Sequence, residues 1–137
     1  MSRNLALEKV GKAKVAYQLQ REGWLVGEAF DDGYDLLAHY PKKNKTCFIE
    51  LKSMDISNRS PGVNLTAPVT PEERKKCSHI VVYVEPEGRF FVARKQNILT
   101  DKGNIFAAIN AKGELSTPRE NSKSFARYEN AWYELLK

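Results

Sequence analysis

Two short apolar segments on either side of a lysine-rich turn constrain the fold of this chain more than any other feature. Residues 34–40 and 46–53 are rich in apolar and aromatic side chains, and the polar connection between them begins with Pro41. Strands joined by so short a connection form an antiparallel hairpin. The sequence therefore predicts two neighbouring antiparallel strands in this region.

The register of this hairpin decides which side chains lie together. When the pairing closes directly across the turn, paired residue numbers sum to 87, so Asp35 lies opposite Lys52. Glu50 then lies opposite Leu37. Strand side chains alternate between two faces, so Asp35, Glu50 and Lys52 share one face, with the two carboxylates on a diagonal of about 7 Å. The other face is apolar, is expected to lie under a helix, and carries Leu36, Ala38, Cys47, Ile49 and Leu51.

Hydrophobic periodicity and turn residues predict the remaining elements. Thr70, Pro71 and Glu73 have the pattern of a helix N-terminus, with an N-cap, a proline at the first helical position and the glutamate of a capping box. Two polar, proline-containing segments, 54–68 and 116–124, are predicted as surface loops. We expect helices at residues 5–22, 71–77 and 124–136, a helical turn at 95–99, and further strands at 24–30, 79–84, 89–93, 105–109 and 114–116. This order predicts an α+β or mixed α/β chain whose residues 1–137 form one domain built on one sheet.

Cysteine usage and hydropathy exclude several classes of protein. Cys47 and Cys77 lack CxxC spacing and clustered histidines, which excludes a disulfide framework and a structural zinc site. The longest apolar run, residues 80–84, is too short to span a bilayer, and the first residues lack the apolar core of a signal peptide. The sequence therefore predicts a cytoplasmic protein with no membrane partner.

The charge of the chain favours a polyanionic partner. Lys and Arg outnumber Asp and Glu by 22 to 17, which gives a net charge of +5. A basic surface attracts nucleic acids through electrostatic steering and the release of counterions. For each basic residue, the alternative is a solvated surface position with no acidic partner. The candidates for contact with nucleic acid are Lys12, Lys14, Lys42, Lys43, Arg59 and Lys75.

Asp35, Glu50 and Lys52 are the candidate site residues. Ionisable groups among apolar strand residues lose hydration, so they require a partner or a bound ion. Two carboxylates and a backbone carbonyl are hard oxygen ligands of the kind that Mg²⁺ prefers. A lysine beside such a metal can orient a water molecule or offset the charge on a phosphate. The alternative is a cross-strand ion pair between Asp35 and Lys52, with Glu50 in solvent.

Four other residues have the chemistry of metal ligands, but their positions favour structural roles. Asp31 and Asp32 belong to a turn-forming FDDG sequence. His39 and His79 occupy predicted strands, where a half-buried histidine is more common than a ligand. We therefore expect none of the four to be a ligand.

The sequence resembles the PD-(D/E)XK nuclease superfamily, which includes restriction endonucleases and archaeal Holliday-junction resolvases. The resemblance covers most of the chain. It rests on the end of the first helix at residues 21–24, the strand entry at 33–36, the motif at 49–53, the strand at 80–84 and the closing segment at 130–136.

This resemblance implies a restriction endonuclease-like α/β core, with a mixed sheet flanked by helices, that hydrolyses phosphodiester bonds of DNA. It implies that Asp35 and Glu50 bind Mg²⁺ or Mn²⁺, with the carbonyl of Leu51 as a third ligand, and that Lys52 is the catalytic lysine. Many members carry a glutamate just after a glycine in the first helix, and here Glu8 is the candidate for that role. A homodimer is a further implication.

Two other functions stay open at this level. Lys12 follows Gly11 where many members have the helix glutamate, which favours a nucleic-acid-binding module that has kept the fold and lost catalysis. A protein-interaction role, as in an immunity protein or antitoxin, is the second alternative. The positive net charge argues against it, because inhibitors of nucleic-acid enzymes tend to be acidic.

Overall fold

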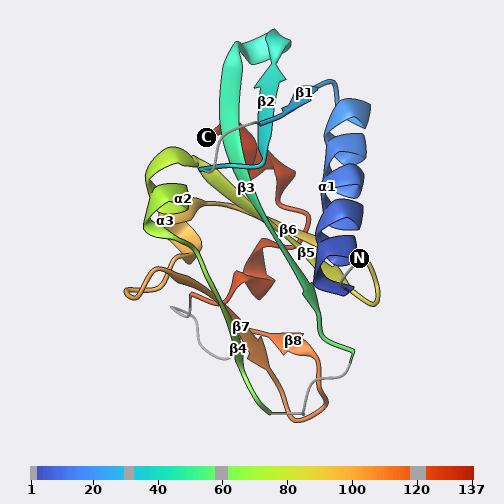
Figure 1. Cartoon of the computed structure of the whole chain (residues 1–137), viewed down its shortest axis with the longest axis vertical. Helices are drawn as coiled ribbons and strands as arrows, with labels where there is room; N and C mark the ends of the chain where they lie inside the picture. The colour runs from blue at the N-terminus through green and yellow to red at the C-terminus, as the bar shows by residue number, and fades with distance from the viewer. Residues whose placement is uncertain (1–2, 30–32, 58–61, 118–122) are drawn as a thin grey trace.

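The protein contains two β-sheets, and its computed structural model describes residues 3–29, 33–57, 62–117 and 123–137 (Figure 1). A five-stranded sheet has the order β1-β2-β3-β5-β6, and a smaller sheet has the order β4-β7-β8. The prediction of a single sheet was wrong, because residues 65–68 form a strand within a segment expected to be a loop. The strands are β1 Leu25–Glu28, β2 Leu36–Tyr40, β3 Lys45–Asp55, β4 Leu65–Pro68, β5 His79–Glu85, β6 Arg89–Arg94, β7 Asn104–Ile109 and β8 Leu115–Ser116.

The helical elements confirm most of the sequence-based predictions. They are α1 Arg3–Arg21, η1 Pro41–Lys43, α2 Pro71–Lys76, α3 Lys95–Ile98, η2 Phe125–Tyr128 and η3 Trp132–Leu136. The capping box at Thr70 is present as predicted. The prediction of a continuous helix at 124–136 was wrong, because two 3₁₀ turns form there instead. Asn130, which lies between them, has a positive φ of 54°. Such a left-handed residue interrupts helical hydrogen bonding.

The hairpin β2–β3 has a register two residues away from the expected one. The structure pairs Tyr40 with Lys45 and Leu36 with Ile49, so the expected pairing of Asp35 with Lys52 was wrong. The connection has four residues in either register, and the structure places it at residues 41–44, where Asn44 ends the 3₁₀ turn in a left-handed conformation with φ 49°. Because strand side chains alternate with a period of two, this shift leaves every side chain on its predicted face.

The β5 strand runs through the middle of the molecule. It is parallel to β3 and antiparallel to β6, so the large sheet is mixed, as predicted. Both faces of β5 are buried: Val81 and Tyr83 pack toward α1, whereas Ile80 and Val82 belong to a second apolar cluster with Ile105 of the small sheet. A strand buried on both faces has the continuous apolar sequence that residues 80–84 show.

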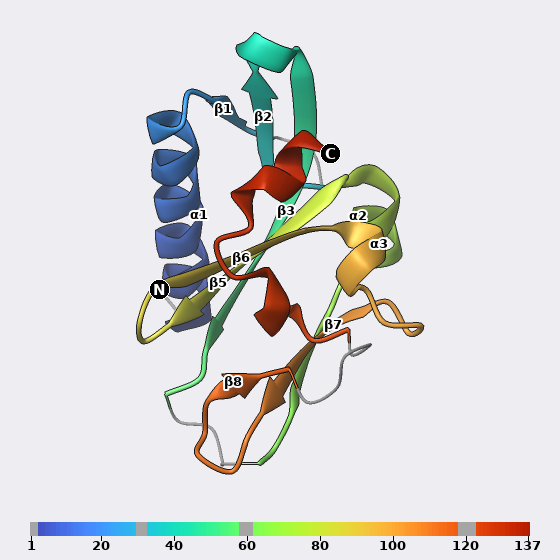
Figure 2. The same cartoon turned by 180° about the vertical axis from the view of Figure 1, so that it is seen from behind.

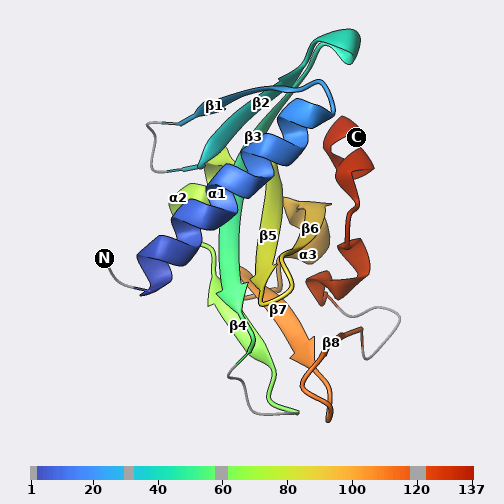
Figure 3. The ribbon, with the colours of Figure 1, turned by 90° about the vertical axis from the view of Figure 1, so that its right-hand side faces the viewer.

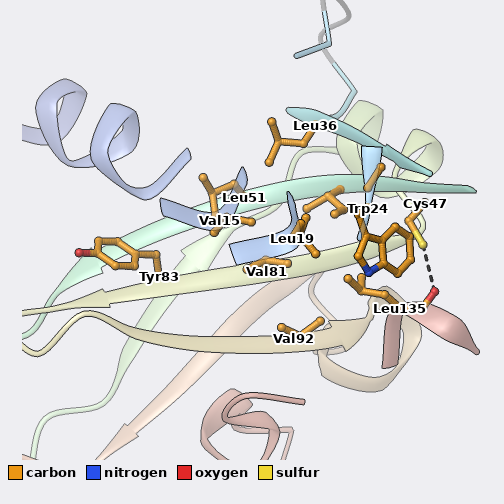
Figure 4. Packing of buried hydrophobic residues seen from close by; sticks show 12 residues of the cluster. Val15, Leu19, Trp24, Leu36, Cys47, Leu51, Val81, Tyr83, Val92 and Leu135 are labelled. Carbon is orange, nitrogen blue, oxygen red and sulfur yellow. Dashed lines mark hydrogen bonds between the residues drawn. The ribbon is translucent and has the colours of Figure 1, made fainter. Parts of the chain in front are cut away.

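The long helix α1 lies across one face of the large sheet (Figure 3). Val15 and Leu19 of this helix pack on the apolar face of the hairpin, as expected for its helix cover (Figure 4). The C-terminal η3 turn joins the same cluster through Leu135, whose carbonyl accepts a hydrogen bond from Cys47 Sγ at 3.1 Å. Figure 2 shows this C-terminal segment from behind. No helix in the described part of the chain has the length and apolar character needed to cross a membrane.

Candidate active site

A cleft of about 950 Å³ lies between the N-terminal half of α1 and strand β4. Strand β3 continues to Asp55, although β2 pairs with it only as far as Ile49, so the last residues of β3 have a partner on the β5 side alone. The cleft follows this unpaired edge. Its lining includes Asp35, Glu50 and Lys52, so the structure brings the three predicted site residues together.

Asp35 takes the place of the missing strand partner. Its backbone N–H donates to the carbonyl of Ile49 at 2.8 Å, immediately before β2 begins. Its side-chain Oδ2 accepts a hydrogen bond from the N–H of Leu51, also at 2.8 Å. Alternate residues of a strand direct their backbone groups to the same edge, so the carbonyl of Leu51 faces this edge beside Asp35.

Glu50 is a buried carboxyl group with 4 % of its surface exposed. Burial raises the pKa of Glu50 to about 10, and a side-chain hydrogen bond with Asp35 together with the negative charge of that residue adds to the increase. The ammonium of Lys52 acts in the opposite direction without reversing the effect. A cation bound beside Glu50 would therefore offset much of the free-energy cost of ionising this buried carboxyl group.

Lys52 lies between the carboxyl groups of Glu50 and Glu73. Its Nζ is 3.2 Å and 3.3 Å from the two carboxylate oxygens of Glu73 and 3.9 Å from Oε1 of Glu50. Burial would raise the pKa of Glu73, but the hydrogen bond from the Thr70 N–H and the charge of Lys52 outweigh burial and lower it. Glu73 is thus an anion that pairs with Lys52.

Glu73 is a site residue that the sequence analysis missed. Its capping-box pattern placed it at the start of α2 and explained its chemistry without a role in the site. The available signal was its position between the strand that carries Lys52 and the next parallel strand. A connection between parallel strands returns along the sheet, so an acidic residue in its helix can reach a lysine on the preceding strand.

The first helix contributes two predicted residues to the cleft. Glu8 and Lys12, which are one helical turn apart, both line it. Lys14 does not: its Nζ lies over the ring of Tyr83, 5.6 Å from the centroid. Gly11 allows this part of α1 to pack closely on β3, because a Cβ added there would lie 2.5 Å from Ser53 Oγ.

The other basic candidates among the described residues, Lys42, Lys43 and Lys75, lie outside the cleft lining. Lys42 and Lys43 are in η1 at the tip of the β2–β3 hairpin (Figure 1). The tip is about 17 Å from Glu50 along β3, at roughly 3.3 Å per residue. Lys75 is exposed on α2. Arg59 lies outside the described residues, as do Asp31 and Asp32.

Comparison with solved structures identifies the fold. No family model and no curated protein sequence matches this chain. The chain is similar to the structure of the bacterial homing endonuclease I-Ssp6803I, with a TM-score of 0.71 and 18% identity over 98% of this chain and 94% of that chain. The protein has a PD-(D/E)XK-like nuclease fold. The predicted restriction endonuclease-like α/β core is therefore confirmed.

A second solved structure with a nuclease fold is Hjc, a Holliday junction resolvase from the archaeal hyperthermophile Archaeoglobus fulgidus. It has a TM-score of 0.49 and 14% identity, over 78% of this chain and 84% of that chain.

Within the nuclease fold, both histidines have partners away from the cleft lining. His39 Nδ1 lies 2.9 Å from the hydroxyl of Thr46 on the neighbouring strand. His79 is buried, and its Nε2 lies 3.0 Å from the carbonyl oxygen of Glu134. These contacts agree with the structural roles expected for strand histidines.

The donor set at the unpaired edge fits a hard divalent cation. Asp35 and Glu50 supply carboxylate oxygens in mutual contact, and the Leu51 carbonyl faces the same edge. In the described part of the nuclease fold, no group of three or more His, Cys, Asp or Glu side chains could hold a metal ion by themselves. A cation here would therefore need oxygens from the backbone, water or a bound phosphate, which is how Mg²⁺ usually binds.

Proposed function

We propose that this protein is a metal-dependent endonuclease that hydrolyses phosphodiester bonds of DNA. The observation that carries the proposal is the hydrogen bond from the Leu51 N–H to Asp35 Oδ2. This bond joins Asp35 to the strand that carries Glu50 and Lys52, so that Asp35 meets Glu50 in the lining of the cleft. The likeness in fold to a homing endonuclease supports the same activity.

The proposed cofactor is Mg²⁺, with Mn²⁺ as a substitute. The carboxylates of Asp35 and Glu50 and the carbonyl of Leu51 would hold it. When bound, such a cation supplies Lewis-acid activation of a phosphodiester and of water. The raised pKa of Glu50 supports this assignment, because a carboxyl group that is costly to ionise alone gains most from a nearby positive charge.

Lys52 is the proposed catalytic lysine. Its ammonium lies 3.9 Å from Oε1 of Glu50, so it acts beside a proposed metal ligand. As water adds to the phosphorus and the bond to the leaving oxygen breaks, negative charge builds on the phosphate oxygens. A fixed ammonium stabilises that charge more in the transition state than in the bound substrate, which is the requirement for catalysis. Glu8 is the further acidic candidate on the helix side of the cleft.

The charge balance of the site predicts an order of binding. Asp35, Glu50 and Glu73 carry three carboxyl groups around the single ammonium of Lys52. A DNA phosphate brought to these residues without a cation meets net repulsion. We therefore expect a divalent cation to strengthen DNA binding, with Lys12 contacting the backbone from the helix side of the cleft.

The proposal is tested by cleavage of supercoiled plasmid and labelled oligonucleotides in Mg²⁺, Mn²⁺ or EDTA. We expect cutting by the wild-type protein with either metal and none in EDTA. Lys52→Ala should abolish cutting, whereas Lys14→Ala, a lysine removed outside the cleft lining, should leave it unchanged. Equal cutting by wild type and Lys52→Ala would contradict the proposed site.

A non-catalytic nucleic-acid-binding module is the second candidate, and Lys12 favours it. This lysine lines the cleft one helical turn from Glu8, where it adds a positive charge on the side proposed to supply an acid. DNA binding that survives in EDTA, without cutting of any substrate in Mg²⁺ or Mn²⁺, would support this candidate over the enzyme.

A further inference from the structure

The ammonium of Lys52 forms an ion pair with both carboxylate oxygens of Glu73. Both oxygens of Glu73 lie within hydrogen-bonding distance of Nζ, at 3.2 Å and 3.3 Å. The two side chains are 19% and 16% exposed, so water screens the pair only in part. Glu50 Oε1 is more distant from Nζ, at 3.9 Å. Glu73 is therefore the stronger partner of Lys52 in this arrangement.

Glu73 is itself held in place by the start of α2. Its Oε1 accepts a hydrogen bond from the Thr70 N–H at 2.8 Å, and its own N–H donates to Thr70 Oγ1 at 3.2 Å. A lysine side chain has four rotatable bonds and loses much entropy when it is confined. A carboxylate fixed by a helix cap gives that lysine one preferred position.

The capping box alone does not require the charge of Glu73. A glutamine at this position of a capping box also accepts the backbone hydrogen bond of the N-cap residue. Outside the cap, the negative charge of Glu73 pairs with the ammonium of Lys52 and accepts a hydrogen bond from the side chain of Glu50. The two roles of the residue are therefore separable by substitution.

We propose that Glu73 is a positioning residue, whose helix-capped carboxylate holds the ammonium of Lys52 beside Glu50 in the lining of the cleft. This inference rests on the proposed function, because it assigns Lys52 a task that needs a fixed position. Glu73 contacts neither substrate nor metal in this role and acts through the position of Lys52, although its side chain also hydrogen-bonds to Glu50.

The test compares Glu73→Gln with Thr70→Val. Glu73→Gln keeps the capping acceptor and removes the charge, whereas Thr70→Val removes the hydroxyl cap and keeps the charge beside Lys52. We expect Glu73→Gln to slow single-turnover cleavage at saturating DNA about tenfold, with a change in the Kd for DNA in Ca²⁺ of less than about twofold. We expect Thr70→Val to lower the Tm and to leave the cleavage rate within about twofold of wild type.

Two results would overturn the proposal. One is cleavage by Glu73→Gln at the wild-type rate. The other is an equal loss of rate in Thr70→Val, because the effect would then come from the placement of α2 rather than from the charge on Lys52.

A denaturation cycle separates this inference from the proposed function. Chemical unfolding of wild type, Lys52→Met, Glu73→Gln and the double variant measures the coupling of the two side chains without DNA. We expect the unfolding equilibrium constant of the double variant to differ by about fivefold from the value that independent effects of the two single substitutions would give. If the wild-type protein cuts no DNA, the proposed function fails, and this coupling then decides whether Glu73 holds Lys52. Independent effects would overturn the inference, whatever the cleavage assay shows.

Discussion

The carboxylate of Asp35 accepts a hydrogen bond from the backbone N–H of Leu51, at 2.8 Å. A side chain here completes the edge of a sheet at the point where the neighbouring strand has ended. The same bond ties the position of a proposed metal ligand to the backbone of the strand that carries Glu50 and Lys52. Changes at Asp35 should therefore affect both folding and the site, and the two effects can be distinguished.

Asp35→Asn should remove metal binding and keep the fold. The amide oxygen still accepts the hydrogen bond from Leu51, while the charge is lost. We expect a Tm within a few degrees of wild type and no detectable heat of Mn²⁺ binding by calorimetry. Asp35→Ala should cost about 1–2 kcal/mol of unfolding free energy, because it leaves the N–H of Leu51 unpaired. An equal loss of stability in the two variants would contradict this role of the hydrogen bond.

Glu50→Gln should make the metal-free protein more stable. Since the pKa of Glu50 is raised in the folded state, wild-type stability falls as the pH rises from the ordinary value of 4.5 toward about 10. Glutamine lacks this penalty, so its stabilising effect should be absent below pH 4.5 and should grow above it. We expect the Tm at pH 8 to rise by at least about 3 °C. Thermal melts at several pH values in EDTA test this, and a Tm difference independent of pH would contradict it.

Lys12 and Lys14 offer a matched test of where DNA lies. Lys12 lines the cleft, whereas Lys14 lies over the ring of Tyr83. Lys12→Ala should weaken DNA binding several-fold and reduce the slope of log K against log salt by about one, as loss of one phosphate contact does. Lys14→Ala removes the same charge and should change neither. Fluorescence anisotropy over a salt series measures both quantities, and equal effects of the two variants would contradict a path through the cleft.

Gly11→Ala should destabilise the protein although alanine favours a helix. The added Cβ would lie 2.5 Å from Ser53 Oγ and 3.2 Å from Tyr83 Cδ2. We expect a loss of about 1–3 kcal/mol in unfolding free energy, which outweighs the gain in helix propensity. Ser53 Oγ is buried without a hydrogen-bond partner in the described structure, so Ser53→Ala should not destabilise, and adding it to Gly11→Ala should recover much of the loss. Urea denaturation tests this, and no recovery in the double variant would exclude the contact with Ser53 as the cause.

The faces of the central hairpin could be predicted from the sequence, but its register could not. Alternation with a period of two placed Asp35 and Glu50 on one face in both the expected and the observed register, because a slip of two residues preserves the faces. The register depended on which four residues form the turn, 41–44 as observed or 42–45 as expected. The 3₁₀ conformation of Pro41–Lys43 and the left-handed Asn44 were not evident from the composition of the turn.

The capping box at Thr70 was predictable because all of its contacts are local. By contrast, β4 exists because Leu65 and its neighbours pair with β7, about forty positions along the chain. A strand of four residues carries too little periodicity to be distinguished from a loop. The pairing of Glu73 with Lys52 was missed for the same reason. It depends on where the crossover places α2 relative to β3, and no local sequence pattern predicts that placement.

The parallel pairing of β3 with β5 has a consequence for the order of folding. It joins Ile49 to His79, thirty positions along the chain. Hairpins with short loops close quickly, whereas a parallel pair must wait for its whole crossover to be placed. Lys52 belongs to an early hairpin, and Glu73 arrives only with the crossover. A nascent or partly folded chain therefore carries the lysine without its acidic partner, and the two side chains meet only after the crossover has placed α2 beside β3.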